Sequence, residues 1–310
     1  MALEGNFAQR RVLITGAAGF IGSHLLARLC EAGAEVHAVS RAARAPAEGG
    51  LRWWRADLAE LERVQSLMRE VRPEIIYHLA SHVSGSRNLK LVDSTFRSNL
   101  MSAVNLLTAA AEIGGCRVVL TGSLEEPDAS EPAAAPSSPY AAAKWAVSGY
   151  GRMFATLYGL PVVLLRVFMV YGPAQRDLTK LVPYVTLCLL RGETPKLSSG
   201  LREVDWVFVD DVVDAFLAAG MAAAVDGNTV DVGSGSLVTI RSVVEQLVQL
   251  IDPRISPQFG ALPDRPFEQV RRADVSAAAS AIGWSPRTSL GQGLKHTVEW
   301  YRRAVESGAL

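Results

Sequence analysis

Cysteine, net charge and metal-ligand clusters are scarce in this sequence of 310 residues. The three cysteines, Cys30, Cys116 and Cys188, are odd in number and scattered, so they predict no disulfide framework. His78 and His82 have no evident third ligand, and we expect no metal site. With 31 Lys and Arg against 31 Asp and Glu, the formal net charge is zero. This balance excludes the strongly basic composition typical of nucleic-acid-binding proteins, and we expect no nucleic-acid partner.

Long hydrophobic runs are also lacking. Arg166 interrupts the longest apolar stretch, Val162–Val170, whereas a membrane-spanning helix needs roughly 18 apolar residues. The first eleven residues, MALEGNFAQRR, contain no apolar core of signal-peptide length. We therefore expect a cytoplasmic protein with no membrane partner.

Short apolar runs alternate with longer amphipathic stretches in the first half of the chain. The strand candidates are near-continuous apolar runs: Val12–Thr15, Glu35–Val39, Arg52–Trp54, Ile75–Leu79, Arg117–Thr121 and Val162–Arg166. The helix candidates between them have a helical apolar period: Phe20–Ala32, Leu58–Glu70, Ser94–Ile113 and Tyr140–Tyr158. Such strands are typical of a parallel sheet covered by helices on both faces. The alternation predicts an α/β fold with a doubly wound parallel Rossmann sheet.

After Gly172 this alternation becomes irregular, which predicts a smaller C-terminal substrate lobe. The helix candidates here are Leu178–Arg191, Asp211–Met221, Ile240–Ile251 and Leu290–Arg303. We assign residues 1–170, plus about 203–235, to the dinucleotide-binding domain, and about 171–202 and 236–310 to the lobe. The acidic, proline-rich stretch Glu125–Pro139 is a candidate active-site loop.

The segment TGAAGFIG, residues 15–22, follows the first predicted strand and opens the first predicted helix. Glycines at such a junction allow a tight turn and close approach of the backbone to a pyrophosphate, which then faces the helix N-terminus. We predict that this loop binds a dinucleotide through four residues, Gly16, Gly19, Phe20 and Ile21.

The end of the second strand bears on which dinucleotide binds. An acidic residue there would bind the adenosine ribose and repel a 2′-phosphate. This chain has Ser40 and Arg41 instead, with Arg44 close behind. A guanidinium can bind a phosphate through paired hydrogen bonds. The pattern favours NADP(H) and leaves NAD(H) possible, the alternative being that Arg41 is a solvated loop residue.

Tyr140 and Lys144 form a candidate catalytic pair. Their i, i+4 spacing places both on one face of a helix that can begin at Pro139. The Lys144 charge is expected to lower the pKa of the phenol so that it exchanges a proton near neutral pH. Ser123 ends the preceding strand, where its hydroxyl would reach the same carbonyl oxygen. The alternative is a surface tyrosine beside an unrelated lysine.

These motifs resemble the extended short-chain dehydrogenase/reductase, or NAD-dependent epimerase/dehydratase, family over essentially the whole chain. The matching segments, beside the glycine loop and the catalytic set, are Asp57-Leu58, His78–Ser81, Asn99, Arg166–Phe168, Val170–Pro173, Asp205–Asp211 and Gly283–Pro286. The resemblance implies that Lys144 also binds the nicotinamide ribose and that Asp57 lies near the adenine. It extends the candidate cofactor site to Asp57, Leu58, Leu79, Ala80, Ser81, Asn99, Tyr140 and Lys144.

The family usually acts on nucleotide-diphosphate sugars and often dimerises through two helices per subunit, here Ser94–Ile113 and Tyr140–Tyr158. Three positions depart from its usual pattern. Met169 stands where many members have Asn, and Val204 stands where Arg is usual. Leu124 replaces the Asp that follows the catalytic hydroxyl in the 4,6-dehydratase branch, which argues against dehydration.

Our candidates for substrate contact are Ser84, Glu125, Met169, Arg176, Arg202 and Arg265. Glu125 and Glu126 are interpreted either as a solvated loop edge or as contacts to substrate hydroxyls. Asp205, Asp210 and Asp211 are interpreted as polar groups at strand ends and helix starts rather than as catalytic residues.

The leading hypothesis is NADPH-dependent reduction of a keto group on a nucleotide-linked 4-keto-6-deoxyhexose by Ser123, Tyr140 and Lys144, in a homodimer. The alternatives are a nucleotide-sugar 4-epimerase with retained NAD and a ketoreductase acting on a non-sugar natural product. A fourth possibility is a non-catalytic dinucleotide sensor, because a fold does not fix a function.

Overall fold

The structure is a computed structural model that describes residues 6–44, 50–128, 135–266 and 268–310. It contains two compact units. The first unit comprises Met1–Val167, Val213–Asp231 and Ser276–Trp284. The second comprises Phe168–Val212, Val232–Val275 and Ser285–Leu310.

A seven-stranded sheet with the order β3-β2-β1-β4-β5-β6-β9 forms the centre of the first unit. Its strands are β1 (Arg11–Thr15), β2 (Glu35–Ser40), β3 (Leu51–Arg55), β4 (Ile75–His78), β5 (Arg117–Ser123), β6 (Val162–Val167) and β9 (Thr229–Val232). Strands β1 to β6 pair in parallel. The strand order reverses direction between β1 and β4, as in a doubly wound sheet. The predicted Rossmann fold is confirmed.

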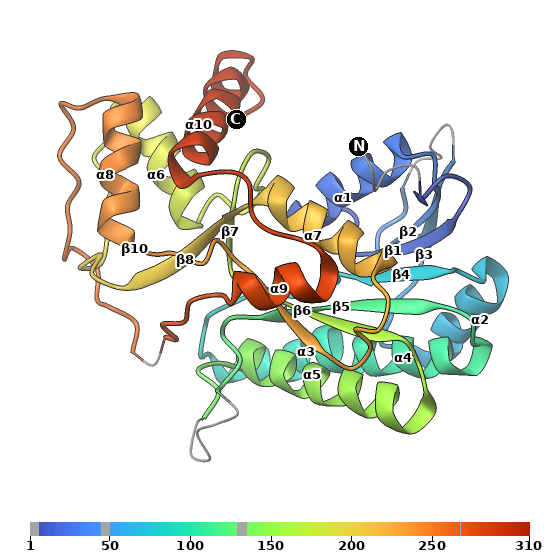
Figure 1. Cartoon of the computed structure of the whole chain (residues 1–310). Helices are drawn as coiled ribbons and strands as arrows, with labels where there is room; N and C mark the ends of the chain where they lie inside the picture. The colour runs from blue at the N-terminus through green and yellow to red at the C-terminus, as the bar shows by residue number, and fades with distance from the viewer. Residues whose placement is uncertain (1–5, 45–49, 129–134, 267) are drawn as a thin grey trace. The chain divides into compact units, whose positions relative to one another are not determined.

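Helices cover both faces of this sheet (Figure 1). On one face lie α2 (Leu61–Val71), α4 (Ser102–Ile113) and α5 (Pro139–Tyr158). On the other lie α1 (Phe20–Glu31) and the part of α7 (Val209–Met221) that belongs to this unit. Strand β4 shows why most of its residues are apolar: Ile76 packs into the core with α2 and α4, and the next residue, Tyr77, meets Phe216 of α7.

The single helix predicted over Ser94–Ile113 is wrong in detail. The structure has a 3-10 turn, η2 (Leu89–Leu91), then α3 (Val92–Thr95), a π-helix, η3 (Phe96–Met101), and finally α4. A π-helical turn is rare and usually occurs at a functional position. Here it contains the buried Asn99, whose side chain binds the backbone of the loop that follows β4.

The second unit has its own three-stranded sheet, in the order β10-β8-β7. The strands are β7 (Met169–Tyr171), β8 (Glu203–Phe208) and β10 (Leu237–Thr239), and the helices are α6 (Leu181–Leu190), α8 (Ile240–Ile251) and α10 (Leu290–Glu306). Two boundaries differ from those expected. Strand β8 lies in this unit because it pairs with β7 and β10, and most of α9 (Val275–Ile282) lies in the first unit.

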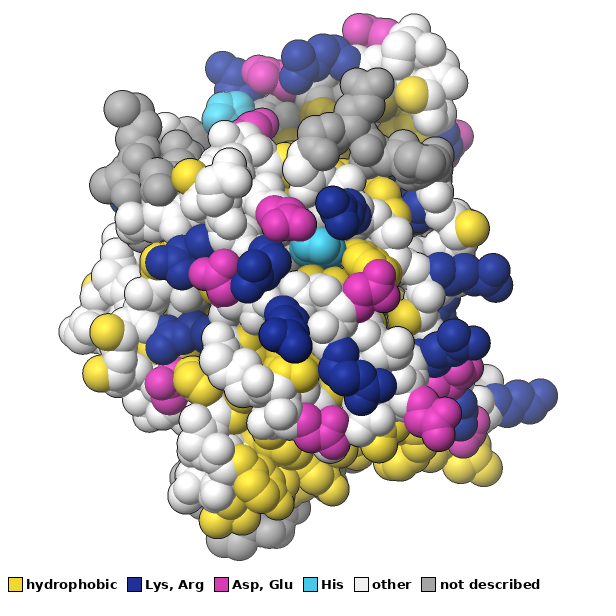
Figure 2. Space-filling view, turned by 90° about the vertical axis from the view of Figure 1, so that its right-hand side faces the viewer, with side chains coloured by type: hydrophobic (Ala, Val, Ile, Leu, Met, Phe, Trp, Pro, Cys, Tyr) yellow, Lys and Arg dark blue, Asp and Glu magenta, His cyan; other side chains and the backbone are white. Residues whose placement is uncertain are grey.

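Charges of both signs are interspersed on the face shown in Figure 2, in line with the zero net charge. Within the described ranges, no helix is both long and apolar enough to cross a bilayer.

Candidate active site

The glycine loop forms a tight turn between β1 and α1. Gly16 has φ +71°, a conformation that favours glycine. A Cβ at Gly16 would lie 2.6 Å from the Ala80 amide nitrogen, and one at Gly22 would collide with the Gly16 carbonyl. Gly19 precedes α1 in an extended conformation and provides no side-chain cap, so N–H groups of the first turn are left for a ligand. This cradle fits the pyrophosphate of a dinucleotide.

The loop after β4 lies against this turn. The Leu79 amide donates to the Thr15 carbonyl at 3.1 Å, and the Ala80 amide donates to Thr15 Oγ1 at 3.2 Å. Ser81 Oγ is buried and has no hydrogen-bond partner among the described residues. A buried hydroxyl without a partner is costly unless a ligand or water binds it. The site therefore fits a dinucleotide at the β1/β4 switch point, where such ligands bind in doubly wound sheets.

Asn99 fixes this loop from the π-helix. Its Oδ1 accepts a hydrogen bond from the His82 amide at 2.7 Å, and its Nδ2 donates to the His82 carbonyl at 3.1 Å. Both ends of the side-chain amide are thus used by the backbone. Asn99 supports the cofactor loop in the structure, and direct contact with a cofactor stays a prediction.

The candidate adenosine end lies where β2 and β3 finish. Ser40 is paired with Arg55 in the sheet, and its carbonyl accepts from the Ala56 amide at 3.1 Å, immediately before Asp57. Arg41 is exposed beside Ser40. Leu58 is buried in the core and Asp57 is exposed. The β2 end therefore offers a cation and a hydroxyl, without a carboxylate on that strand end.

The structure brings the predicted catalytic residues together. Ser123 ends β5 and is buried. Helix α5 begins at Pro139 because Ser138 caps it, its Oγ accepting from the Ala141 amide at 3.2 Å. One turn of this helix separates Tyr140 from Lys144, whose Nζ lies 5.9 Å from the centroid of the Tyr140 ring. The Ser123 side chain also lies near enough to the phenol to lower its pKa.

The expected effect of Lys144 on Tyr140 is wrong in this structure. Burial raises the pKa of Tyr140 to about 12, although the Ser123 hydrogen bond lowers it; the Glu126 and Glu125 charges raise it further. Burial likewise lowers the pKa of Lys144 to about 8, against the opposing effect of Glu126. Burial outweighs the expected attraction between Lys144 and Tyr140, because burial disfavours both the charged amine and the charged phenol. Lys144 Nζ donates instead to the Thr121 carbonyl at 2.7 Å.

His78 lies beneath this group at the end of β4. Its Nδ1 is 2.8 Å from Thr15 Oγ1, and its carbonyl accepts from Thr121 Oγ1 at 2.8 Å. Burial, followed by the charge of Lys144, lowers the pKa of His78 to about 3. The imidazole is therefore neutral near pH 7. Through these two hydrogen bonds His78 links Thr15 at the glycine turn to Thr121 on β5, whose carbonyl accepts from Lys144.

The sequence suggests for Glu126, as for Glu125, a solvated loop edge or a contact to substrate hydroxyls, and the structure places Glu126 elsewhere. The Glu126 side chain is only 3% exposed, directly behind Ser123. Glu125 is half-buried and accepts from Ser137 Oγ at 3.4 Å. The available signal was Gly122, because a glycine within a strand often marks close approach by another group. Residues 129–134 of the candidate loop Glu125–Pro139 lie outside the described residues.

The other candidates for substrate contact are divided between the units. Ser84 is half-buried in the first unit, and Met169 is half-buried on β7 of the second. Arg202 forms an ion pair with Glu268 at 3.1 Å and also donates to a backbone carbonyl at 2.7 Å. Arg176 and Arg265 are exposed. Phosphate binding by Arg202 would thus compete with an existing ion pair.

Asp205 and Asp211 hold backbone segments of the second unit in place. Asp205 is 1% exposed and accepts from the amides of Ser234, Gly235 and Ala273. Asp211 accepts from the Arg287 amide at 3.2 Å and from the next amide at 2.9 Å. These contacts bear out their interpretation as structural polar groups.

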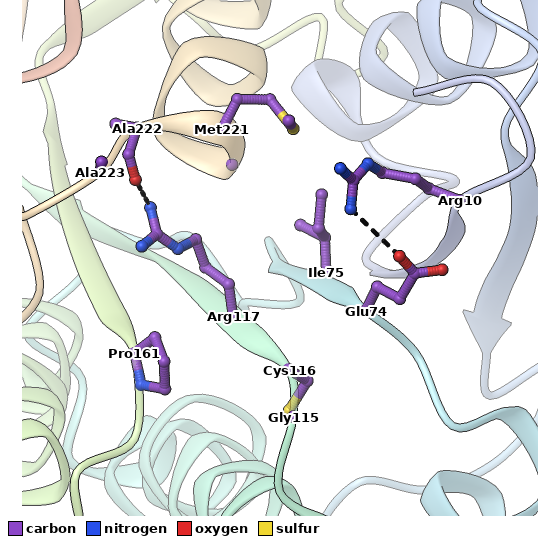
Figure 3. A pocket seen from close by; sticks show the side chains of 11 residues that line it. Arg10, Glu74, Ile75, Gly115, Cys116, Arg117, Pro161, Met221, Ala222 and Ala223 are labelled. Carbon is purple, nitrogen blue, oxygen red and sulfur yellow. Dashed lines mark hydrogen bonds and ion pairs between the residues drawn. The ribbon is translucent and has the colours of Figure 1, made fainter. Parts of the chain in front are cut away.

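A shallow pocket lies at the amino-terminal ends of β4 and β5, at the end of these strands opposite the candidate active site (Figure 3). Its guanidinium groups are already engaged: Arg10 pairs with Glu74 at 3.1 Å, and Arg117 pairs with Asp226 at 3.1 Å and donates to the Ala222 carbonyl. Ligands of doubly wound sheets bind at the carboxyl ends of the strands. This pocket is therefore distinct from the candidate active site.

Comparison with known proteins agrees with this geometry. The model of the NAD-dependent epimerase/dehydratase family matches residues 12–233. A UDP-glucose 4-epimerase of Mycolicibacterium smegmatis is 33% identical over 312 residues, covering 94% of this chain and 98% of that protein. The crystal structure of the Thermotoga maritima UDP-glucose 4-epimerase with UDP-glucose has a TM-score of 0.86 at 27% identity, covering 95% of this chain and 99% of that one. That of the Thermus thermophilus UDP-glucose 4-epimerase with NAD has a TM-score of 0.80 at 30% identity, covering 95% and 99%. The chain belongs to the NAD-dependent epimerase/dehydratase family.

Proposed function

We propose that this protein reduces a keto group on a nucleotide-linked sugar, with NADPH as the reductant and a 4-keto-6-deoxyhexose as the sugar. The observation that carries the proposal is the end of β2, where Ser40 is followed by the exposed Arg41 and the strand end has no carboxylate. A cation at this position attracts the 2′-phosphate that distinguishes NADPH from NADH. NADPH that binds and leaves as a free reductant is consistent with net reduction of the substrate.

The dinucleotide, when bound by the glycine turn and Lys144, supplies the hydride. Tyr140 donates the proton to the oxygen that develops negative charge, and Ser123 donates a hydrogen bond to the same oxygen. Because the pKa of Tyr140 is raised to about 12, the phenol holds its proton at neutral pH. Lys144, one turn further along α5, orients the cofactor.

The residue after Ser123 supports reduction over dehydration. A 4,6-dehydratase of this family has an acid there that protonates the leaving hydroxyl. Leu124 is 5% exposed and has no proton to give. Recognition of a substrate phosphate would also differ from the usual pattern of the family, because Val204 is buried on β8 at the position where an arginine is usual.

The second candidate is a nucleotide-sugar 4-epimerase with retained NAD. It is favoured by the 33% identical relative and by the solved epimerase that contains NAD. An epimerase would use the same three residues, oxidising and then re-reducing the sugar carbon. The two functions differ in the identity and retention of the cofactor, which makes the cofactor the sharpest discriminator.

The test is to denature the purified protein and to identify and quantify the dinucleotide released. We expect empty sites that take up added NADP(H) in preference to NAD(H). Near-stoichiometric NAD(H) that survives dialysis would establish the epimerase instead. In parallel, Tyr140→Phe should reduce turnover of keto-sugars about a hundredfold or more, with dinucleotide binding retained. Near-normal turnover by that variant would refute the catalytic assignment under either function.

We also propose that the protein is a homodimer assembled through the two predicted helices, Ser94–Ile113 and Tyr140–Tyr158. Helix α5 exposes Trp145, Leu157 and Tyr158 by 43%, 67% and 60%. Apolar side chains gather along the lower edge of Figure 2, the edge to which α4 and α5 belong in Figure 1. Exposed apolar patches of this kind are typical of interfaces. Light scattering should give twice the chain mass, and Trp145→Lys combined with Leu157→Lys should give a monomer; a wild-type monomer refutes the proposal.

A further inference from the structure

Glu126 is a buried carboxylate that the mechanism above does not use. It lies on the short turn after β5 and is 3% exposed. Its Oε1 accepts a hydrogen bond from the Ser123 amide at 2.7 Å, and its Oε2 accepts from Ser148 Oγ, on α5, at 2.7 Å. One side chain therefore connects the backbone of Ser123 to the helix that carries Tyr140 and Lys144.

The local backbone is adapted to this carboxylate. A Cβ at Gly122 would lie 2.6 Å from Glu126 Oε1, so only glycine leaves room for it. The Glu126 amide also donates to the Ser123 carbonyl at 3.1 Å, which closes the turn. Burying a carboxylate is expensive, and a structural role alone could be filled by an uncharged side chain. A carboxylate in this place therefore indicates a role beyond filling space.

We propose that Glu126 is a positioning residue for the keto-reduction proposed above, because its carboxylate fixes Ser123 against α5. The inference rests on that proposed function. This role follows from the two short hydrogen bonds to Ser123 and Ser148. A change in the pKa of Lys144 is a further expected consequence, because the charge of Glu126 opposes the effect of burial on that amine.

The charged and titratable groups around Lys144 come from three elements. Glu126 and Glu125 follow β5, Tyr140 lies one turn earlier on α5, and His78 ends β4. His78 is neutral, and Tyr140 is protonated at neutral pH. Burial lowers the pKa of Lys144, and Glu126 is the group that raises it. Removing the Glu126 charge should therefore lower the pKa of Lys144 below about 8, so that the ammonium is lost at lower pH.

The test compares Glu126→Gln with wild type. The glutamine oxygen can still accept from the Ser123 amide and its NH₂ can donate to Ser148, so the change removes the charge with little change in shape. We expect kcat for keto-sugar reduction to fall about tenfold or more, because small displacements of a catalytic group are costly. We also expect the alkaline limb of the pH–rate profile to move to lower pH, while dinucleotide affinity changes little. Glu112→Gln, on the exposed surface of α4, is the matched control and should leave both unchanged.

A second variant separates the hydrogen bond of the carboxylate from its charge and guards against misfolding of the first. Ser148→Ala removes one hydrogen bond of the carboxylate and keeps its charge, so kcat should fall while the alkaline limb stays in place. Wild-type kcat in Ser148→Ala overturns the positioning role, even if Glu126→Gln does not fold. A folded Glu126→Gln enzyme with wild-type kcat and pH profile overturns the whole inference. If Tyr140→Phe is itself fully active, the proposed function fails, which is a separate result.

Discussion

Because His78 is buried and neutral, we predict that the protein loses stability as the pH is lowered. Its ring is 3% exposed, against Thr15 Oγ1, and burial lowers its pKa to about 3 from an ordinary 6.5. Between those two pH values the unfolded chain binds a proton at this histidine and the folded protein does not. The free energy of unfolding therefore falls as pH is lowered through this window. Below about pH 3 the contribution of His78 is constant.

The size of the effect follows from the two pKa values. Each unit of difference is worth about 1.4 kcal/mol, so lowering the pH from 6.5 to 4 should remove about 3 kcal/mol through His78 alone. The variant to compare is His78→Asn, whose side-chain oxygen can still accept from the Thr15 hydroxyl but does not titrate in this range. Urea denaturation at several pH values between 4 and 7 gives the free energy of unfolding of each protein.

The readout is the difference in slope between the two proteins, because carboxylates that titrate in the same window contribute equally to both. His78→Asn should be less stable than wild type at pH 7 and should lose about 3 kcal/mol less on going to pH 4. His82→Asn, an exposed histidine four residues along the chain, is the control and should leave the wild-type slope unchanged. Parallel curves for wild type and His78→Asn would refute the argument that a buried neutral imidazole supports the site.

Three further predictions concern single positions. Gly16→Ala should abolish dinucleotide binding, measured by calorimetry, because the new Cβ would lie 2.6 Å from the Ala80 amide nitrogen and the φ of +71° is strained for alanine. Gly220→Ala should destabilise by about 1–3 kcal/mol, opposite to the usual effect in a helix, because its Cβ would collide with the Tyr77 hydroxyl; adding Tyr77→Phe should restore stability in thermal melts. Arg41→Asp should shift the ratio of NADP(H) to NAD(H) affinity by about ten- to a hundredfold toward NAD(H), and an unchanged ratio would remove the basis for NADPH.

The first unit could be predicted closely because its strands are buried on both faces. Val12–Thr15 and Ile75–Leu79 are recognisable as strands without knowing their partners, and each agrees with the structure to within one residue. Helix α8 of the second unit also begins where predicted, because Thr239 caps it and accepts from the Ser242 amide at 3.1 Å. These features depend on local sequence alone and can therefore be predicted from it.

The second unit could not be predicted in the same way. Strands β7 and β10 have three residues each, and a run of three carries no measurable period. The residues of β8 were noticed as a motif but not as a strand, because their partners are distant in sequence. The π-helix at η3 is stabilised by contacts of Asn99 with a separate loop, which a helical apolar period does not reveal.

The same dependence on contacts between distant residues explains which features of the candidate site could be predicted. The identities of Ser123, Tyr140 and Lys144 could be proposed from spacing, because each occupies a fixed place in a strand–helix unit. The direction in which the pKa of Tyr140 moves could not, because it depends on burial rather than on the distance to Lys144. The burial of Glu126 behind Ser123 could not be predicted for a related reason: two adjacent glutamates are equivalent in the sequence, and only the fold buries one of them.

The pKa values of the site also bear on the direction of the reaction. With the pKa of Tyr140 at about 12, forming the phenolate at pH 7 costs about 7 kcal/mol. A reaction that begins by donating a proton starts from the populated, protonated phenol. A reaction that begins by removing a proton from a sugar hydroxyl, as an epimerase must, starts from the rare phenolate unless the bound cofactor lowers that cost. The proposed reduction would therefore start from the populated form of Tyr140, whereas an epimerase built on these residues would have to obtain the missing stabilisation from a cofactor that stays bound. This is why retention of the dinucleotide, rather than the identity of the three catalytic residues, distinguishes the two functions.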